Sequence, residues 1–489
     1  MTNLPPGWAH ATLGDIADTT LGKMLDRKKG TGKHLKPYLR NLNVQWGNID
    51  LDNVLMMDIP PEEEEIFRLR SGDLLVCEGG EIGRCAIWTD DGTEMFFQKA
   101  LHQVRPLGGI SPDYLRFLLE WLSDEGVLLD FATGTTIKHL PQERLRRLPV
   151  PLPPLAEQQR IVANLKDHFS RLDVLAQAIK SSQKKIRELA KKIIIDAVSV
   201  AGDLDWKWIT VGEAGEVDLG RQRHPDWHSG PNMRPYLRVA NVFEDRIDTS
   251  DLMEMDFPPD IFDRFRLTEG DILLNEGQSP EYLGRPAMYR GEPKDVAFTN
   301  SLLRFRAGPE VDPEWALLVF RRHMHAGRFM QETRITTNIA HLSASRFKSV
   351  EFPVPPLEEQ REIVKQVARK LADVGLLASQ IRRVEERAKA LRSRLLADAF
   401  SGRLVHRDPT EEPVAELLKR IQTQREALRA KRPRRTARAS RRGAGDLAQK
   451  DAGGDGFTGA EPLSVPSTTV GASHTGKQED LFQQEGLTA

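Results

Sequence analysis

The chain is built from two copies of one sequence pattern. "KPYLRNLNVQWGNIDL" from Lys36 matches "RPYLRVANVFEDRIDT" from Arg234, and "PLPPLAEQQRIV" from Pro151 returns as "PVPPLEEQREIV" from Pro353. Matches that keep their order over this distance indicate an internal duplication, which has to be recognised before local structure is assigned. We therefore expect two similar domains in tandem.

Each copy begins with a mixture of short strands and helices. Short apolar stretches such as "DLLVCE" and "ILLNE" are separated by Gly, Asp and Asn, a pattern typical of strands joined by turns. "SPDYLRFLLEWLSD" and "DPEWALLVFRRHMH" have a proline and an acidic residue where a first helical turn favours them. The expected fold class is α+β, with a mixed α/β domain in each copy.

The repeated twelve-residue motif predicts the end of a strand and the start of a long helix. Leu152 and Val354 precede prolines, which exclude the helical conformation at that residue. Apolar residues then recur in steps of four and three over residues 161–193 and 363–395, as in a coiled coil. If a two-fold axis relates the copies, the two helices run antiparallel and separate the two domains. The alternative is that each helix packs only on its own domain.

These patterns divide the chain into five segments. The expected segments are a first domain (1–153, head 1), a first spacer helix (154–201), a second domain (202–355, head 2), a second spacer helix (356–405) and an extension (406–489) with a possible short helix and a basic, polar tail. The residues expected to form the helix contacts and to dock partner subunits are Leu155, Ile161, Leu165, Leu172, Ile179, Leu357, Ile363, Val367, Val374 and Ile381.

Composition bounds the class of protein. A chain of 489 residues exceeds one hydrophobic core, and no apolar run is long enough for a transmembrane helix. The first residues lack the features of a signal peptide, so a cytoplasmic location is expected. Cys77 and Cys85, the only cysteines, have no metal-site spacing and are expected to be buried free thiols.

Recognisable enzyme motifs are missing from the sequence. "GTGKH" at Gly30 lacks the first glycine and the Ser/Thr of a phosphate-binding loop, and the carboxylates form no recognisable acid–base pair. No metal site is expected. A binding or scaffold protein is favoured over an enzyme.

Two similar domains with different polar loops favour bivalent binding of a long ligand, and DNA suits these side chains. Arg and Lys bind phosphates, while Arg–guanine and Asn/Gln–adenine pairs read base edges. The net charge of −1 argues against tight DNA binding by this chain alone. Arg40 and Arg238, present in both copies, are expected in structural ion pairs. The candidate DNA-binding residues are Lys23, Arg27, Lys28, Lys33, Lys36, Gln98, Lys99, Thr135, Thr136, Lys138, Arg221, Arg223, Arg234, Thr299, Asn300, Arg334, Thr336 and Asn338.

The combination of motifs resembles the specificity (S) subunit of type I restriction–modification systems. The resemblance rests on "PxPPLxEQxxIV" before a long heptad helix and on the paired "PYLR", "GDLL/GDIL" and "TTIKHL/TNIAHL" blocks. It covers residues 5–407 and implies two target recognition domains, each reading half of a bipartite double-stranded DNA site. It also implies a non-catalytic chain that binds no cofactor. Two methyltransferase subunits would use S-adenosylmethionine, and restriction subunits would use ATP and Mg²⁺.

Two other interpretations remain open from the sequence. The chain could be a coiled-coil assembly scaffold with two protein-binding heads and no DNA contact. It could also be the recognition part of a methyltransferase–nuclease that is divided differently among its subunits.

Overall fold

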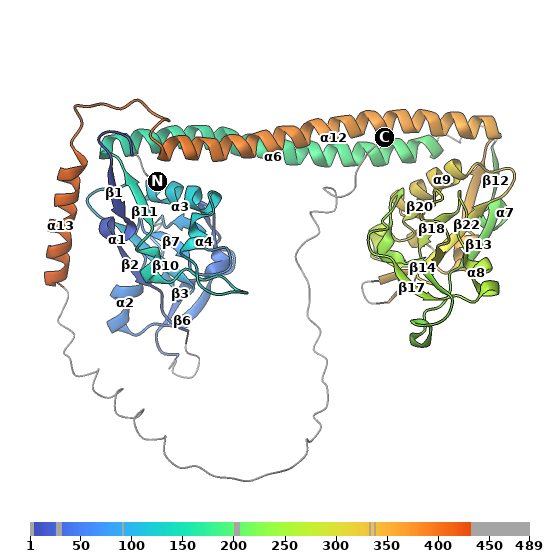
Figure 1. Cartoon of the computed structure of the whole chain (residues 1–489), viewed down its shortest axis with the longest axis horizontal. Coiled ribbons are helices and arrows are strands. Elements are labelled where there is room, and N and C mark those ends of the chain that lie inside the picture. Colours follow the sequence, from blue (N-terminus) through green and yellow to red (C-terminus); the bar gives the residue numbers. More distant parts are fainter. Residues whose placement is uncertain are drawn as a thin grey trace, which may run out of the picture. The chain divides into compact units, whose positions relative to one another are not determined.

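The computed structural model of the chain describes residues 4–25, 32–89, 92–199, 206–331, 334–336 and 339–431 (Figure 1). These residues form two compact units. Unit 1 contains the residues up to Ala176 together with those from Glu385 onward, and unit 2 contains Gln177–Val384. Each unit is therefore one head with parts of both long helices.

Head 1 is a mixed α/β domain. Its central sheet has the strand order β2-β10-β7-β8 and is antiparallel, and a second sheet, β6-β3-β9, contains the parallel pair β3–β9. The elements are β1 (Ala9–Thr12), α1 (Leu13–Ile16), β2 (Ala17–Leu21), β3 (Leu35–Leu39), η1 (Asn41–Asn43), β4 (Val44–Gln45), β5 (Asn48–Ile49), β6 (Leu55–Asp58), α2 (Pro61–Phe67), β7 (Leu74–Cys77), β8 (Cys85–Ile87), β9 (Phe96–Phe97), β10 (Leu101–Pro106), α3 (Pro112–Asp124), α4 (Val127–Asp130), α5 (Gln142–Leu145) and β11 (Pro149–Leu152).

Strand β7 is apolar throughout because both of its faces are buried. Successive side chains of a strand point to opposite faces. Leu74 and Val76 accordingly join the core under α3, whereas Leu75 and Cys77 join a second core with Leu39 and other residues. A continuous apolar run is what such a central strand requires.

Head 2 repeats this architecture with the same strand orders, β13-β22-β18-β20 and β17-β14-β21. It also has the three-stranded sheet β19-β24-β23, whose counterpart in head 1 consists of isolated bridges between Gly79, His139 and Thr133. The elements are β12 (Lys207–Thr210), α7 (Val211–Ala214), β13 (Gly215–Leu219), η2 (Pro225–Trp227), β14 (Met233–Leu237), η3 (Val239–Asn241), β15 (Val242–Phe243), β16 (Arg246–Ile247), β17 (Met253–Asp256), α8 (Pro259–Phe265), β18 (Ile272–Asn275), β19 (Gly277–Gln278), η4 (Pro280–Tyr282), β20 (Pro286–Met288), β21 (Ala297–Phe298), β22 (Leu302–Ala307), α9 (Pro313–His325), α10 (Arg328–Gln331), β23 (Arg334–Thr336), β24 (Ile339–His341), α11 (Ala344–Lys348) and β25 (Glu351–Val354).

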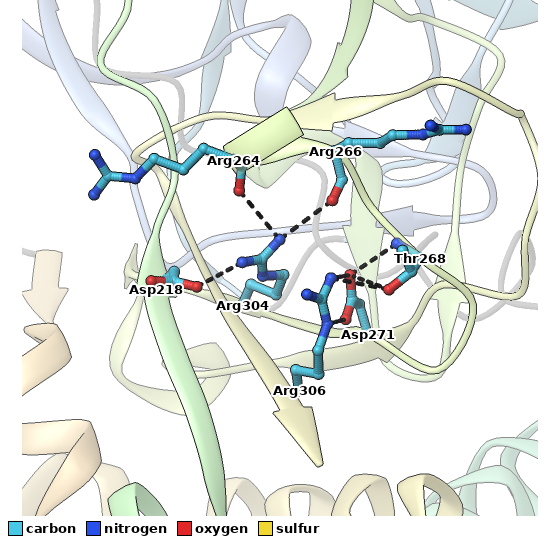
Figure 2. Close-up of polar contacts among 7 residues, drawn as sticks. All are labelled: Asp218, Arg264, Arg266, Thr268, Asp271, Arg304 and Arg306. Carbon is cyan, nitrogen blue, oxygen red and sulfur yellow. Dashed lines mark hydrogen bonds and ion pairs between the residues drawn. The ribbon is translucent and has the colours of Figure 1, made fainter. Parts of the chain in front are cut away.

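A buried aspartate paired with a partly exposed arginine recurs on the central sheet of each head. In head 2, Asp271 accepts two hydrogen bonds from Arg306, at 2.7 and 2.8 Å (Figure 2). In head 1, Asp73 accepts two from Arg105, both at 2.7 Å. Such bidentate pairs satisfy a buried carboxylate that would otherwise be costly.

On this sheet head 2 also has a buried arginine, Arg304, where head 1 has a glutamine. The Arg304 guanidinium lies 2.5 Å from Asp218 and also donates to the carbonyls of Arg264 and Arg266 (Figure 2). The residue at the matching position of head 1, Gln103, donates instead to Asp73 at 2.6 Å. The two heads thus share a framework but stabilise it with different polar residues.

The repeated glutamine of the twelve-residue motif fastens each long helix to its head. Gln158 on α6 (Leu155–Ser199) is buried, and its amide donates to the Pro153 carbonyl at 3.0 Å. Gln360 on α12 (Leu357–Phe400) makes the same contact with Pro355 at 2.7 Å. Buried carbonyls need a hydrogen-bond donor, and the glutamine supplies it at the step from extended chain to helix.

The two long helices pack together in antiparallel directions. In unit 1, the first part of α6, with Ile161 and Leu165, shares a core with the last part of α12, with Leu396. In unit 2, the last part of α6, with Ile194, shares a core with the first part of α12, with Val367. The predicted fold class is confirmed, and packing of each helix on its own domain alone is excluded.

The heptad interpretation was wrong for part of the stripe. Of the heptad positions, Ile161, Leu165, Ile179, Val367 and Val374 are buried and Leu172, Ile363 and Ile381 are partly buried. Leu189, Leu377, Val384 and Leu391 are exposed heptad positions. Leu155 and Leu357, which precede the two heptad rows, are partly buried and exposed. An α-helix turns every 3.6 residues, so a row spaced by 3.5 rotates by about 20° per heptad relative to a straight contact line.

The extension after α12 begins with an ordered segment that belongs to unit 1. Helix α13 (Val414–Lys431), drawn in orange, lies beside α1 and β2 (Figure 1). Its Leu417 and Ile421 are buried in the head 1 core, and Gln424 accepts a hydrogen bond from the Gly108 amide at 2.7 Å. The predicted short helix is present, and the basic run from Lys431 lies almost wholly outside the described residues.

We expect Ile421→Ala to destabilise unit 1 selectively. Removing a buried isoleucine to alanine costs about 2–5 kcal/mol. Hydrogen exchange should show lower protection of the β2 and β10 amides, with unit 2 unchanged. Gln422→Ala, at an exposed neighbouring position, is the control. Equal protection in both variants would contradict the packing of α13 on head 1.

Candidate nucleic-acid interface

Several loops of head 1 meet at the carboxyl end of β7. The Glu78 amide donates to the Ala100 carbonyl at 2.9 Å, and the Leu140 amide donates to the Glu78 carbonyl at 2.7 Å. The Asn41 side chain donates to the Gly79 carbonyl at 2.8 Å. The turn at residues 98–100, the loop at 133–139 and the start of η1 are therefore neighbours.

Lys23 and Lys36 border this region but are engaged in ion pairs within head 1. The Lys23 backbone bridges to Gln98, and its ammonium group pairs with Glu63. The Lys36 ammonium group lies 2.8 Å from Glu94 and 3.1 Å from Glu64, and its hydrogen bonds to these two carboxylates raise its pKa. A phosphate would have to replace these partners.

The other described candidates of head 1 are more accessible. Lys33 and Lys99 are exposed, and Gln98 is partly exposed. Thr135, Thr136 and Lys138 are exposed in the loop at 133–139. The structure thus brings Gln98–Lys99 and this loop to one region of the head.

Arg221 and Thr299 in head 2 are buried and serve the head itself. Arg221 is 9% exposed, donates to the Asp256 carbonyl and stacks on Trp227 at 4.0 Å from the ring centre. Thr299 is 0% exposed and donates from its hydroxyl to the Leu237 carbonyl at 3.2 Å. The aromatic and backbone partners available to these residues were not visible from the sequence, and their burial removes them from our set of DNA contacts.

The remaining candidates of head 2 are at the surface or outside the described side chains. Arg223, Arg234 and Asn300 are exposed. Arg334 and Thr336 are the ends of β23, of whose side chains nothing is described. Asn338 of head 2, and Arg27 and Lys28 of head 1, lie outside the described residues.

The repeated arginines outside the candidate set have structural partners. Arg238 lies 2.5 Å from Asp251, which confirms the expected ion pair. Arg40 instead donates to the Asn53 carbonyl at 3.3 Å, because head 1 has an asparagine where head 2 has Asp251.

Cysteine and metal chemistry offer no alternative site in the described chain. Cys77 and Cys85 are buried free thiols, as predicted, and burial raises the pKa of Cys77 to about 11. Among the described residues no group of three His, Cys, Asp or Glu side chains could hold a metal ion. No helix in the described part is long and apolar enough to cross a membrane.

Comparison with known protein families decides the identity of this architecture. The model of the type I restriction modification DNA specificity domain matches residues 5–182 and 233–383, more than half of the chain. The chain belongs to this family. Specificity subunits of the family recognise the DNA target and have no catalytic activity of their own.

Full-length relatives agree with this assignment. The EcoKI specificity subunit of Escherichia coli (strain K12) is 22% identical over 88% of this chain and 98% of its own length. The StySPI specificity subunit of Salmonella potsdam is 23% identical over 86% of this chain and 96% of its own length.

Solved structures show the same fold. A chain from a structure of complex assembly and conformational transition in a type I R–M system covers 83% of this specificity subunit and 100% of itself, with a TM-score of 0.66 and 19% identity. The HsdS subunit from Thermoanaerobacter tengcongensis covers 82% of this chain and 98% of its own length, with a TM-score of 0.50 and 19% identity.

We expect Arg221→Ala to lower the stability of unit 2 and Arg223→Ala to leave it almost unchanged. Arg221→Ala should lower the free energy of unfolding of unit 2 by about 2–4 kcal/mol, because it removes a stacked cation and leaves a carbonyl unpaired. Arg223→Ala, two residues away and exposed, should change it by less than about 0.5 kcal/mol. Denaturant unfolding followed by hydrogen exchange measures both. Similar losses in the two variants would disprove the structural role of Arg221.

Proposed function

We propose that this specificity subunit reads a bipartite target in double-stranded DNA, with one half-site for each head. The observation that carries the proposal is that the two heads share one framework and differ in their exposed polar side chains. An identical framework presents a loop at the same place, and a different side chain there reads a different base. The domain boundaries at 153, 201, 355 and 405 are part of this proposal.

The exposed candidates divide by chemistry into phosphate and base contacts. Lys33, Lys99 and Lys138 in head 1 carry charge suited to phosphates, as do Arg223 and Arg234 in head 2. Gln98 and Asn300 occupy matching turns of the two heads, and amides of this kind pair with adenine. Thr135 and Thr136, with Arg334, Thr336 and Asn338 in the other copy, complete the proposed set.

We assign Lys23 and Lys36 to the support of the head. Each ammonium group has a carboxylate partner within head 1, so binding a phosphate would exchange one ion pair for another. The gain in affinity from such an exchange is small compared with that from an exposed lysine.

The long helices are the proposed docking surface for two methyltransferase subunits. In unit 2, Leu189 on α6 and Leu377 and Val384 on α12 are large apolar residues left exposed on otherwise charged helices. We assign these residues to the docking surface because a bound subunit would remove their apolar area from water. Those subunits would carry S-adenosylmethionine, and restriction subunits would carry ATP and Mg²⁺. The complex would act in the cytoplasm, and the helices would set the gap between half-sites.

Methylome sequencing of a host with and without this gene tests the proposal. We expect one bipartite adenine-methylated motif to be present only when the gene is intact. The readout depends on sequence-specific DNA recognition, so an assembly scaffold without DNA contact predicts no such motif. An unchanged methylome in a host that has the methyltransferase subunit would reject the proposal.

Lys138→Ala should weaken DNA binding by the complex of this chain with its methyltransferase subunits. If Lys138 contacts one phosphate, the slope of log affinity against log salt should fall by about 0.9, with little change in preferred sequence. Binding to the motif found by sequencing, measured over a series of salt concentrations, provides the slope. Lys419→Ala removes the same charge from α13 and should leave the slope unchanged. Identical slopes for all three proteins would remove Lys138 from the interface.

A further inference from the structure

The loop at residues 133–139 of head 1 stands on a short three-stranded root. Thr133 and His139 exchange both backbone hydrogen bonds, at 2.8 and 2.9 Å, and His139 also bridges to Gly79. His139 is therefore in the middle of the root, between the outgoing chain at Thr133 and the end of the central strand. The next residue, Leu140, is fully buried.

Head 2 builds the same root from a related sequence. There His341 is paired with Gly277 on one side and with Arg334 on the other, within the sheet β19-β24-β23. The Leu342 amide donates to the Glu276 carbonyl at 2.8 Å, as Leu140 does to Glu78 in head 1. The histidine and glycine are thus kept in both copies.

In each root the histidine ring lies directly against the glycine. A Cβ on Gly79 would lie 3.1 Å from Nδ1 of His139, and a Cβ on Gly277 would lie 3.0 Å from Nδ1 of His341. Few real Cβ contacts are so close, so a methyl group here would displace the ring by a few tenths of an ångström. The ring and the glycine are therefore in direct packing contact beside the backbone hydrogen bonds that hold the loop.

The loop that this root supports is short and exposed in head 1. Residues 134–138 are all exposed, and Gly134 has a φ of 90° that L-residues disfavour. A Cβ at Gly134 would lie 2.2 Å from the Ile137 carbonyl oxygen, so the turn itself is tight. Thr135, Thr136 and Lys138 are consequently presented on a constrained backbone.

We propose that His139 is a positioning residue for DNA readout: its ring, packed on Gly79, holds the loop at residues 134–138 at the height where its side chains reach the bases. The inference rests on the proposed DNA recognition, and it assigns no contact between the imidazole and DNA. The exposed residues 134–138 determine which base is preferred. The hydrogen-bonded residues Thr133 and His139 determine where this loop lies. A loose recognition loop loses discrimination because wrong bases can be accommodated by small shifts.

His139→Ala is the test variant, because the histidine is exposed and its removal leaves the core intact. The complex of the full chain with its methyltransferase subunits is assayed on duplexes of the wild-type motif and on a panel with one base pair changed at a time. We expect discrimination in one half-site to fall about tenfold, with the other half-site unchanged.

His139→Phe is the matched control, since it keeps a flat ring against Gly79 but no imidazole nitrogen. It should retain most of the discrimination. Gly79→Ala, which displaces the ring, should reproduce the loss seen with His139→Ala. Thermal unfolding of His139→Ala should match that of the wild type, which separates mispositioning from unfolding.

The outcomes separate this inference from the proposed function. If the wild-type complex reads both half-sites and His139→Ala reads them equally well, the positioning role is overturned. If His139→Phe loses as much as His139→Ala, the imidazole itself contacts DNA and positioning is again overturned. If the wild-type complex shows no sequence preference in either half, it is the proposed function that has failed.

Discussion

The core of head 1 is completed by residues from the last turns of α12, and the rest of the structure depends on this closure. Phe400, the last residue of α12, stacks on Trp121 with ring centres 5.1 Å apart and also contacts Tyr114. Arg392 lies 3.8 Å from the centre of the Phe169 ring and 2.7 Å from Glu120. Because both long helices contribute to each head, neither helix can be removed without exposing a core.

The same constraint explains why the twelve-residue motif occurs in both copies. Each helix must leave its head in a defined direction if it is to reach the core of the other unit. A buried glutamine fixes that direction by donating a hydrogen bond from its amide to the carbonyl of a preceding proline. This glutamine is Gln158 in one copy and Gln360 in the other. Helix α13 then covers part of head 1, adding Leu417 and Ile421 to its core.

Much of the fold was predictable because a duplicated sequence shows its framework directly. Repeated blocks placed the strands, the long helices and their antiparallel packing. Burial at individual positions was not predictable. Arginine is usually found at the surface, yet the guanidinium of Arg221 packs on the rings of Trp227 and Phe257 inside head 2. Leu377 has the spacing of a core residue, yet it is exposed.

The loops of the candidate interface were predictable from the sequence, but the partners of their side chains were not. The sequence pattern indicated where the copies differ, and those differences coincide with exposed loops such as residues 134–138. It did not indicate which lysines are held by carboxylates, because the partners Glu63 and Glu94 are distant along the chain. In the sequence, the histidine of this root was visible only as a residue shared by "TTIKHL" and "TNIAHL", without an indication of its packing on a glycine.

The most direct test of the account is an exchange of head 1, residues 1–153, for the equivalent domain of a relative with a different known target. The methylated motif of the resulting complex is then sequenced. Independent heads predict that one half of the motif changes to that of the donor while the other half is kept. A motif that changes in both halves, or in neither, would contradict the assignment of one half-site to each head.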